Sequence, residues 1–551
     1  MTQFKKFWLG CLSGLWLAVL GGQAPMAQAA ERIYISFSLF ERSIALRDLE
    51  IFAEEGRVQG SLGAYTRFFD DQQLEQFRAG LVAPIDLTPL SVAQFLYTPV
   101  GEGLLQRAGQ VVRPKSGQGR LTALRSALIL GAADPEGLTA LSAIRNFPTQ
   151  GVQVDLRSAL GIFESAQQVL QDTQLAVKAI QAEPSVVPEE DLIARGKTLQ
   201  VQGAYAWQKQ TLKLNDDSVK RQTYTGRTRK FFADLYVPRA KADGPRPVIV
   251  ISHGFNSNRE TYAYLAEHLA SHGYVVAVPE HSGSNTAQLQ ALLEGRARNI
   301  IKPTEFLDRP LDVSFLLDVL EMRSQTDPSI GPLNLEQVGV FGQSFGGYTA
   351  LALGGASLTF NQLYEDCAQL RNTLNLSLLF QCQARLLIPK PYKLADPRIK
   401  AVVAVNSIGS SLLGSDAYGE IEVPVMLVSG SSDTVAPALS EQIRPFSWLT
   451  TPNKYLLMMV GGNHFSTIGV PATDDQNSIG EILDLPLGGP APDEARQDLK
   501  TLSLAFMNAF VTNQPQNLEY LTPGYVSTLS QPALPLALTQ DLMLEEAAAE
   551  E

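Results

Sequence analysis

Short apolar runs alternate with segments of helical spacing from about residue 205 onward, and this alternation limits the possible folds more than any other feature. The segments between the runs place apolar residues three or four positions apart, as in Tyr262, Leu265 and Leu269. Strands joined through helices run parallel, so the pattern predicts an α/β fold with a mostly parallel sheet and helices on both faces. The predicted strands are 230–237, 247–252, 274–279, 338–341, 399–405, 425–429 and 455–460, followed by a last helix near 495–511.

The residues before this region have a different pattern. Over 41–181, apolar side chains recur at helical spacing, as in Leu74, Phe77 and Leu81, and no internal repeat is found. This pattern predicts a mainly α-helical domain over residues 30–181.

Composition marks the remaining boundaries. Residues 182–191 read AEPSVVPEED, which combines two prolines with four acids, so we predict a linker over 182–204. The α/β domain is then expected over 205–515. Residues 516–551 are Pro-rich and then acidic, which predicts a loosely held C-terminal tail.

Residues 1–29 have the pattern of an export signal. Lys5 and Lys6 precede an apolar run over 7–20, and Ala27-Gln28-Ala29 fits a cleavage site. A membrane anchor is the alternative, but the run is shorter than the ~20 residues that span a bilayer. We therefore expect cleavage near Ala30 and an exported protein, periplasmic or secreted.

The charge balance is acidic. The 551 residues carry 44 Lys+Arg against 56 Asp+Glu, which gives a formal net charge of -12. The sequence contains no run rich in Lys and Arg, so it does not indicate the basic surface that nucleic-acid binding requires. Nucleic acid is therefore not expected as a partner.

A Gly-x-Ser-x-Gly motif follows one of the predicted strands. Gly342-Gln343-Ser344-Phe345-Gly346 comes directly after the strand 338–341 and precedes a helical stretch. This is the context of a nucleophile elbow, a strained turn in which Gly342 and Gly346 lack the Cβ atoms that would clash. The motif predicts Ser344 as a nucleophile.

A serine hydroxyl needs a base, and an acid must orient that base. Of the five histidines only His464 follows Ser344 in the chain, and it comes after the last predicted strand. Asp433 ends the segment after the strand 425–429, which fits the chain order Ser, Asp, His. Asp416 is the alternative acid.

The negative oxygen of a tetrahedral intermediate needs fixed N–H donors. Phe345 follows the nucleophile and supplies the first, and Phe255, in the loop after the strand 247–252, is predicted to supply the second. His253 in the same loop and His281 are expected to brace loops. The alternatives are a catalytic role for His253 and a pocket-lining role for His281.

Residues 357–396 lie between the helix after Ser344 and the next predicted strand. Insertions at this place often form a lid. The segment holds Cys367 and Cys382, the only cysteines after the export signal. Export into an oxidising compartment predicts a disulfide between them, and two buried thiols are the alternative.

The region from about 205 to 515 resembles the α/β-hydrolase superfamily through four motifs. They are 252–256 (SHGFN), 342–347 (GQSFGG), 430–437 (GSSDTVAP) and 463–465 (NHF). Within the superfamily these motifs resemble secreted bacterial esterases of the dienelactone hydrolase and cutinase-like lipase group. GQSFGG is also similar to the platelet-activating-factor acetylhydrolases, although their secreted members carry the triad acid where this chain has Asn406. The N-terminal part resembles a helical domain of unknown function found ahead of such hydrolases.

These motifs and resemblances lead us to expect an exported serine carboxylic ester hydrolase. Its substrates are expected to be short-chain or lipid-like esters, and neither a metal nor an organic cofactor is implied. A serine peptidase of the prolyl oligopeptidase type is one alternative, because residues 344–348 (SFGGY) also suit it, but the β-propeller usual in that family is not indicated. A non-catalytic binding protein on the same fold is another.

Overall fold

The computed structural model of the chain describes residues 29–38, 40–67, 69–183, 185–239, 244–370, 373–469 and 489–542. The predicted export signal, residues 1–29, lies outside the described residues except for its last position. No helix within these described ranges is long and apolar enough to cross a membrane. The chain divides into two compact units, Met1–Ala93 with Leu105–Ala159, and Gln94–Leu104 with Leu160–Glu551.

The first unit combines helices with a small sheet. Four strands pair in the order β2-β1-β4-β3, and β4 lies parallel to β1 although more than 100 residues separate them. Phe52, Leu62 and Leu141 are among the side chains of its core. The helical pattern predicted most of this unit but not its sheet. The elements are β1 (Arg32–Phe37), β2 (Phe40–Ala45), α2 (Leu46–Glu55), η1 (Gly60–Leu62), α3 (Gly63–Thr66), α4 (Asp71–Val82), β3 (Val112–Pro114), α7 (Arg120–Ala132), α8 (Ala140–Arg145) and β4 (Gly151–Asp155).

Three helices contain residues of both units, namely α5 (Pro89–Leu96), α6 (Pro99–Val111) and α9 (Leu156–Gln181). Within the second unit, Val100 is buried in the main core. Gly103 lies so close to Leu379 that an added Cβ would be 2.5 Å from Leu379 Cδ2. A short segment from the N-terminal region is thus part of the second unit.

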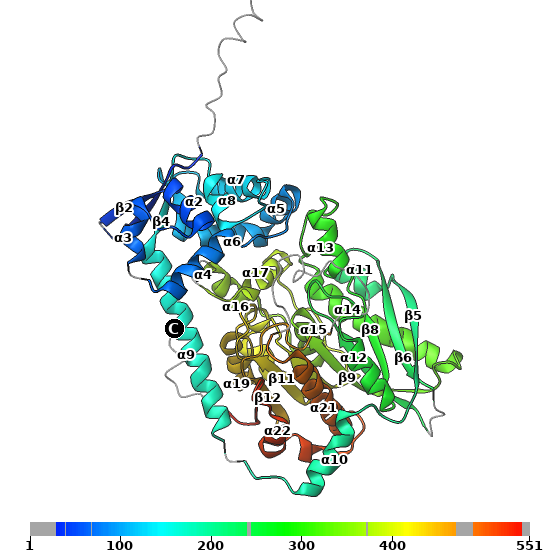
Figure 1. Cartoon of the computed structure of the whole chain (residues 1–551). Coiled ribbons are helices and arrows are strands. Elements are labelled where there is room, and N and C mark those ends of the chain that lie inside the picture. Colours follow the sequence, from blue (N-terminus) through cyan, green and yellow to red (C-terminus); the bar gives the residue numbers. More distant parts are fainter. Residues whose placement is uncertain are drawn as a thin grey trace, which may run out of the picture. The chain divides into compact units, whose positions relative to one another are not determined.

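A nine-stranded sheet forms the centre of the second unit (Figure 1), in the order β13-β12-β11-β10-β9-β7-β8-β6-β5. The six strands from β12 to β8 are parallel, and β13, β6 and β5 run antiparallel to their neighbours. The strands are β5 (Trp207–Asp216), β6 (Arg229–Pro238), β7 (Arg246–Ser252), β8 (Val275–Pro279), β9 (Leu333–Gln343), β10 (Ile399–Val405), β11 (Val425–Gly430), β12 (Lys454–Met459) and β13 (Leu536–Thr539). All seven predicted strands are present, and the predicted fold class is confirmed.

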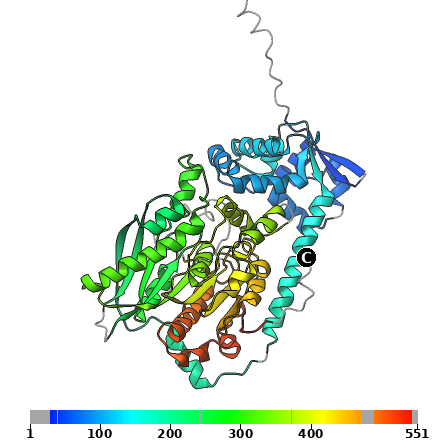
Figure 2. The same cartoon turned by 180° about the vertical axis from the view of Figure 1, so that it is seen from behind.

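Helices cover both faces of this sheet, as the views from the front and from behind show (Figures 1 and 2). Alternate strand residues enter two separate cores: Val248 and Val250 face one core, and Ile249 and Ile251 face the other. The first core includes side chains of α14 and α15, and the second includes those of α12 and α21. The helices of this unit are α10 (Glu190–Gln200), α11 (Val219–Thr225), α12 (Ala263–Ser271), α13 (Thr286–Leu293), α14 (Glu305–Thr326), α15 (Phe345–Gly354), α16 (Phe360–Ala368), α17 (Ser377–Gln381), η2 (Cys382–Leu386), α18 (Ser410–Gly419), η3 (Leu439–Ile443), α19 (Arg444–Trp448), α21 (Pro492–Phe510), η4 (Pro515–Tyr520) and α22 (Pro523–Leu529).

Two predictions about the ends of this region are wrong. Residues 516–542 of the predicted loose tail are firmly held, because β13 pairs with β12 and Leu521, Tyr525 and Leu538 are buried. Residues 543–551 of that tail lie outside the described residues. The linker 182–204 contains the helix α10, whose Leu199 is buried in the second core. Proline and acidic residues suggested loose chain in both places, but scattered apolar side chains reach the core.

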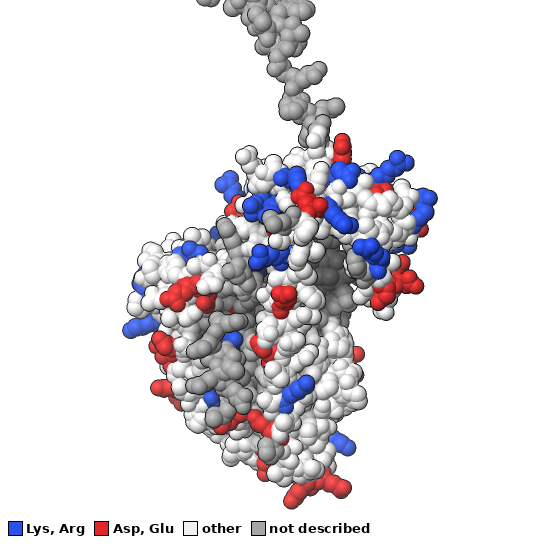
Figure 3. Space-filling model, turned by 90° about the vertical axis from the view of Figure 1, so that its left-hand side faces the viewer, with Lys and Arg blue, Asp and Glu red and all other residues white. Residues whose placement is uncertain are grey.

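The charged side chains are interspersed on the face of the molecule shown in Figure 3, where much of the surface is uncharged. Neither sign forms a continuous area on that face.

Candidate active site

Ser344 occupies the strained turn that its motif predicts. It lies between β9 and α15 with φ 55° and ψ -117°, a left-handed conformation that is rare for residues other than glycine. A Cβ on Gly342 would lie 2.0 Å from the carbonyl oxygen of Gly346, and one on Gly346 would lie 2.0 Å from that of Ser252. Gly342 is therefore required by the tightness of the turn, and Gly346 by the close approach of the end of β7.

The structure brings Ser344, His464 and Asp433 together at the carboxyl ends of their strands. Ser344 Oγ and His464 Nε2 lie 2.9 Å apart, and His464 Nδ1 and Asp433 Oδ2 lie 2.7 Å apart. The exposed fractions of the three residues are only 7%, 4% and 6%. Since a carboxylate accepts hydrogen bonds, Nδ1 of His464 carries the proton and Nε2 accepts from the serine hydroxyl.

Asp433 is held by the backbone that follows it. Its Oδ1 accepts hydrogen bonds from the N–H groups of Val435 and Ala436, each at 2.8 Å, which leaves Oδ2 directed at His464. The alternative acid, Asp416, lies exposed on α18. The structure thus places Asp433 beside the histidine, and Asp416 is not part of this group.

The loop after β7 lies against the serine. A Cβ on Gly254 would be 3.4 Å from Ser344 Cβ, so Phe255 follows directly after the point of contact. Phe345, the first residue of α15, has no helical partner for its N–H. In the described part of the chain no group accepts a hydrogen bond from the N–H of Phe255 or of Phe345. Phe345 thus follows Ser344 directly in the sequence, and Phe255 follows the glycine that lies against it.

Two family models match the chain. Residues 29–155 match the model described as "Alpha/beta hydrolase of unknown function (DUF1400)", and residues 201–364 match the model described as "Chlorophyllase". Together with the sheet order and the turn at Ser344, these matches decide the superfamily. The chain is an α/β-hydrolase. No curated protein matches the sequence of this hydrolase.

Two amides of the hydrolase, which the sequence reasoning did not assign, hold the loop that carries His464. Gln343 Nε2 donates to the carbonyl oxygen of His464 at 3.1 Å. Asn406 Nδ2 donates to the same oxygen at 3.3 Å, while its Oδ1 accepts the N–H of Gly430 at 2.8 Å. The position of Asn406, at the end of the strand after the nucleophile helix, is the signal that could have found it.

His253 and His281 are buried and brace the loop after β7. His253 Nε2 accepts the N–H of His281 at 3.0 Å, and its Nδ1 lies 2.8 Å from the carbonyl oxygen of Gly254. His281 bonds Ser252 Oγ through Nε2 and Asp312 Oδ2 through Nδ1. Burial lowers the pKa of His253 to about 3 and lowers that of His281 as well, so both rings are neutral at pH 7. These contacts match the expected bracing roles.

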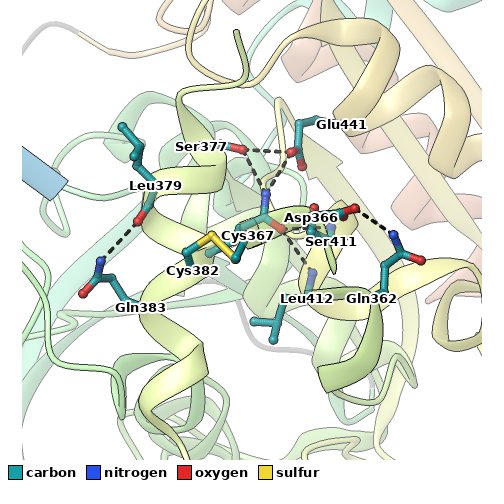
Figure 4. The surroundings of a disulfide bond; sticks show 11 residues. Gln362, Asp366, Cys367, Ser377, Leu379, Cys382, Gln383, Ser411, Leu412 and Glu441 are labelled. Atoms are coloured by element: carbon teal, nitrogen blue, oxygen red, sulfur yellow. Dashed lines mark hydrogen bonds between the residues drawn. A yellow bond between two sulfur atoms is a disulfide. The ribbon is translucent and has the colours of Figure 1, made fainter. Parts of the chain in front are cut away.

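The insertion 357–396 is tied to the rest of the hydrolase unit. The buried carboxylate of Glu441 accepts side-chain hydrogen bonds from Asn375, Ser377 and Gln381, and also from the backbone N–H groups of Gly409 and Ser410. Figure 4 shows the bond between Ser377 and Glu441. One carboxylate therefore joins the insertion to the start of α18. Leu363 and Ala384 of the insertion are fully buried in the main core.

Cys367 and Cys382 form a disulfide within this insertion (Figure 4), as the sequence predicted. The bond joins α16 to the start of η2. Across the described residues, no group of three or more His, Cys, Asp or Glu side chains could hold a metal ion.

Proposed function

We propose that the hydrolase is a serine carboxylic ester hydrolase that works through Ser344, His464 and Asp433. The observation that supports this most strongly is the hydrogen-bonded series from Ser344 Oγ through His464 to Asp433. The match over residues 201–364 to the chlorophyllase model, an esterase-like family, also favours ester hydrolysis.

In this mechanism Ser344 Oγ attacks the ester carbonyl while His464 Nε2 takes the hydroxyl proton. Asp433 keeps the imidazole in the required orientation and stabilises its protonated form. His464 then gives the proton to the leaving alcohol, and an acyl group remains on Ser344. Water activated by the same histidine releases the acid and restores the serine.

The developing negative charge on the carbonyl oxygen needs donors that are already in place. We assign this task to the N–H groups of Phe255 and Phe345, which flank Ser344. Each such donor contributes about 10²- to 10³-fold in rate in comparable hydrolases.

The substrate class that we propose is short-chain or lipid-like esters. Phe255 and Phe380 lie beside each other with ring centroids 5.0 Å apart, so apolar surface adjoins one proposed oxyanion donor. An acyl chain rather than a charged group suits such a surface.

Hydrolysis of p-nitrophenyl esters of increasing acyl length tests the proposal, with an acetylated phospholipid and a peptide p-nitroanilide in parallel. Ser344→Ala and His464→Ala should each lower ester turnover by on the order of a millionfold, because the triad acts as a unit. Ser357→Ala and His272→Ala are matched controls, since these residues bond Glu420 and the Val201 carbonyl. Residual activity of Ser344→Ala above about a tenth of wild type would reject the serine mechanism, and faster peptide than ester cleavage would favour the peptidase.

We further propose that the protein is exported, with residues 1–29 removed. The Cys367–Cys382 disulfide supports this, because disulfides persist in oxidising compartments. N-terminal sequencing of the protein recovered from the exported fraction should begin near Ala30. A protein that keeps Met1 would contradict cleavage.

A further inference from the structure

Arg309, on α14, is a buried cation that the mechanism above does not use. Its side chain is completely enclosed, yet in the described chain no carboxylate lies within ion-pair distance of it. Its three hydrogen bonds all go to neutral oxygens: Nε donates to Ser284 Oγ at 2.9 Å, Nη1 to the His253 carbonyl at 2.6 Å and Nη2 to the Gly254 carbonyl at 3.2 Å.

Enclosing a guanidinium without a direct counter-ion is unfavourable unless dipoles replace the water that it loses. Here the replacements are the two carbonyl groups, the ring of Phe345 with its centroid 4.3 Å away, and Glu305, which accepts from Ser284 Oγ at 2.9 Å. The two carbonyl groups and the ring of Phe345 belong to the two segments that lie beside Ser344. The guanidinium is therefore buried next to the proposed oxyanion donors.

The Gly254 carbonyl and the Phe255 N–H belong to the same peptide unit. Since a peptide is planar, a hydrogen bond that fixes the carbonyl also fixes the direction of the N–H. Arg309 and His253 Nδ1 both bond this carbonyl. A cation on the carbonyl oxygen also polarises the peptide, which makes its N–H a stronger donor.

The second donor, Phe345, is reached by the same guanidinium through its ring. The ring lies over the Arg309 guanidinium and also contacts Phe306, with ring centroids 4.8 Å apart. One side chain therefore contacts the peptide that carries the Phe255 N–H and also the ring of Phe345.

The helix that carries Arg309 is itself held firmly. Asp308 and Asp312, on either side of Arg309 in α14, bond the buried Arg221, and Asp312 also bonds Arg229. Pro310 has no N–H to donate to Phe306, and the hydroxyl of Tyr348 on the nucleophile helix donates to that carbonyl oxygen at 2.7 Å. The part of α14 that carries Arg309 is thus bonded to β6 through Arg229 and to α15 through Tyr348.

We propose that Arg309 is a positioning residue for the oxyanion hole, which aligns the Gly254–Phe255 peptide and the start of α15 for the transition state. This inference rests on the proposed ester hydrolysis. It assigns to α14 a role that no motif around Ser344, Asp433 or His464 includes.

Arg309→Lys is the main test, because lysine keeps the charge but cannot bond two adjacent carbonyl groups with a planar fork. We expect kcat for p-nitrophenyl butyrate to fall about 10- to 100-fold, since misaligned donors act on the transition state, while KM changes less than about twofold. The inhibition constant of a trifluoromethyl ketone, which forms a tetrahedral oxyanion on the serine, should rise by the same factor. Ser284→Ala removes the hydroxyl that accepts from Arg309 Nε, and it should lower kcat about 3- to 10-fold. This variant replaces Arg309→Lys as the test if the lysine variant does not fold.

Arg398→Lys is the matched control, because Arg398, away from the serine, likewise bonds a backbone carbonyl, that of Ser314, although it is also paired with the carboxylate of Asp396. Unchanged kcat in Arg309→Lys, or in Ser284→Ala if only that variant folds, would overturn the proposal. An equal loss in the Arg398 control, accompanied by equal thermal destabilisation, would also overturn it. Wild-type protein that neither cleaves esters nor reacts with a fluorophosphonate would instead reject the proposed function itself.

Discussion

The side-chain amide of Asn406 donates to the carbonyl oxygen of His464 at 3.3 Å. The same amide accepts the N–H of Gly430, so it joins the ends of β10 and β11 to the histidine loop. Asn406 has φ 43°, a left-handed conformation that asparagine tolerates better than most residues. Asn406, at the end of β10, therefore braces the loop that carries His464 against β11, the strand that precedes Asp433.

Asn406→Ala should lower kcat about tenfold, because His464 loses one of two hydrogen bonds to its carbonyl oxygen. It should also lower the melting temperature, since the alanine is strained at positive φ and leaves the Gly430 N–H without its partner. Asn406→Asp, which cannot donate to His464, should lose at least as much kcat as the alanine variant. Ester kinetics and thermal unfolding check both, and full activity of Asn406→Asp would refute the brace.

Asp433→Asn should reduce kcat about ten-thousandfold, since the amide stabilises the wrong tautomer of His464. Asp416→Asn should leave kcat unchanged, because Asp416 is exposed on α18. The comparison uses the same ester and pH for both variants. The reverse ranking would transfer the role of the acid to Asp416.

Cys367→Ser should destabilise the hydrolase unit without abolishing catalysis. The disulfide closes a loop of 14 residues between the two cysteines, which contributes about 3 kcal/mol. We expect the melting temperature to fall by about 5 °C. Two thiols that react with an alkylating agent in unreduced protein would show that the bond is absent in solution.

Phe380→Ala should change acyl preference more than activity on the smallest ester. Removing the ring that faces Phe255 opens space beside a proposed oxyanion donor, so kcat/KM for bulky acyl groups should rise about tenfold relative to acetate. Leu386→Ala is the control, because Leu386 belongs to the same insertion and is 71% exposed. An equal change in the two variants would remove Phe380 from the acyl site.

Asp498→Asn should stabilise the protein above neutral pH. Burial raises the pKa of Asp498 to about 7, and no group in the described chain bonds its Oδ2. The folded state therefore binds a proton that the unfolded state releases near pH 4, so stability falls as pH rises from about 4 to 7. The asparagine variant should lose this slope and gain up to about 4 kcal/mol at pH 8, with little gain at pH 4. Urea unfolding at both pH values measures the difference, and equal gains at both would contradict the assignment.

The strands around Ser344 and the triad order could be predicted from the sequence because their causes are local. A strand such as β10 is apolar at every position except Lys400, and a Cβ on Gly342 would clash with Gly346, only four residues along the chain. Chain order then left His464 as the only histidine after the nucleophile. These features depend on neighbours in the chain, and they were enough to predict the superfamily and the candidate triad.

Other features depend on contacts between distant segments, and only the tertiary structure decided them. β4 joins β1 from more than 100 residues away, and β13 completes the sheet from a tail that its composition marked as loose. Glu441 has no motif around it, yet its carboxylate is saturated by an insertion some 60 residues earlier. In the sequence Arg309 is likewise only a charged residue of a predicted helix. Its enclosure against the Gly254 carbonyl follows from tertiary packing. Burial and hydrogen bonding at long range give these residues their roles, and neither can be read from the residues beside them.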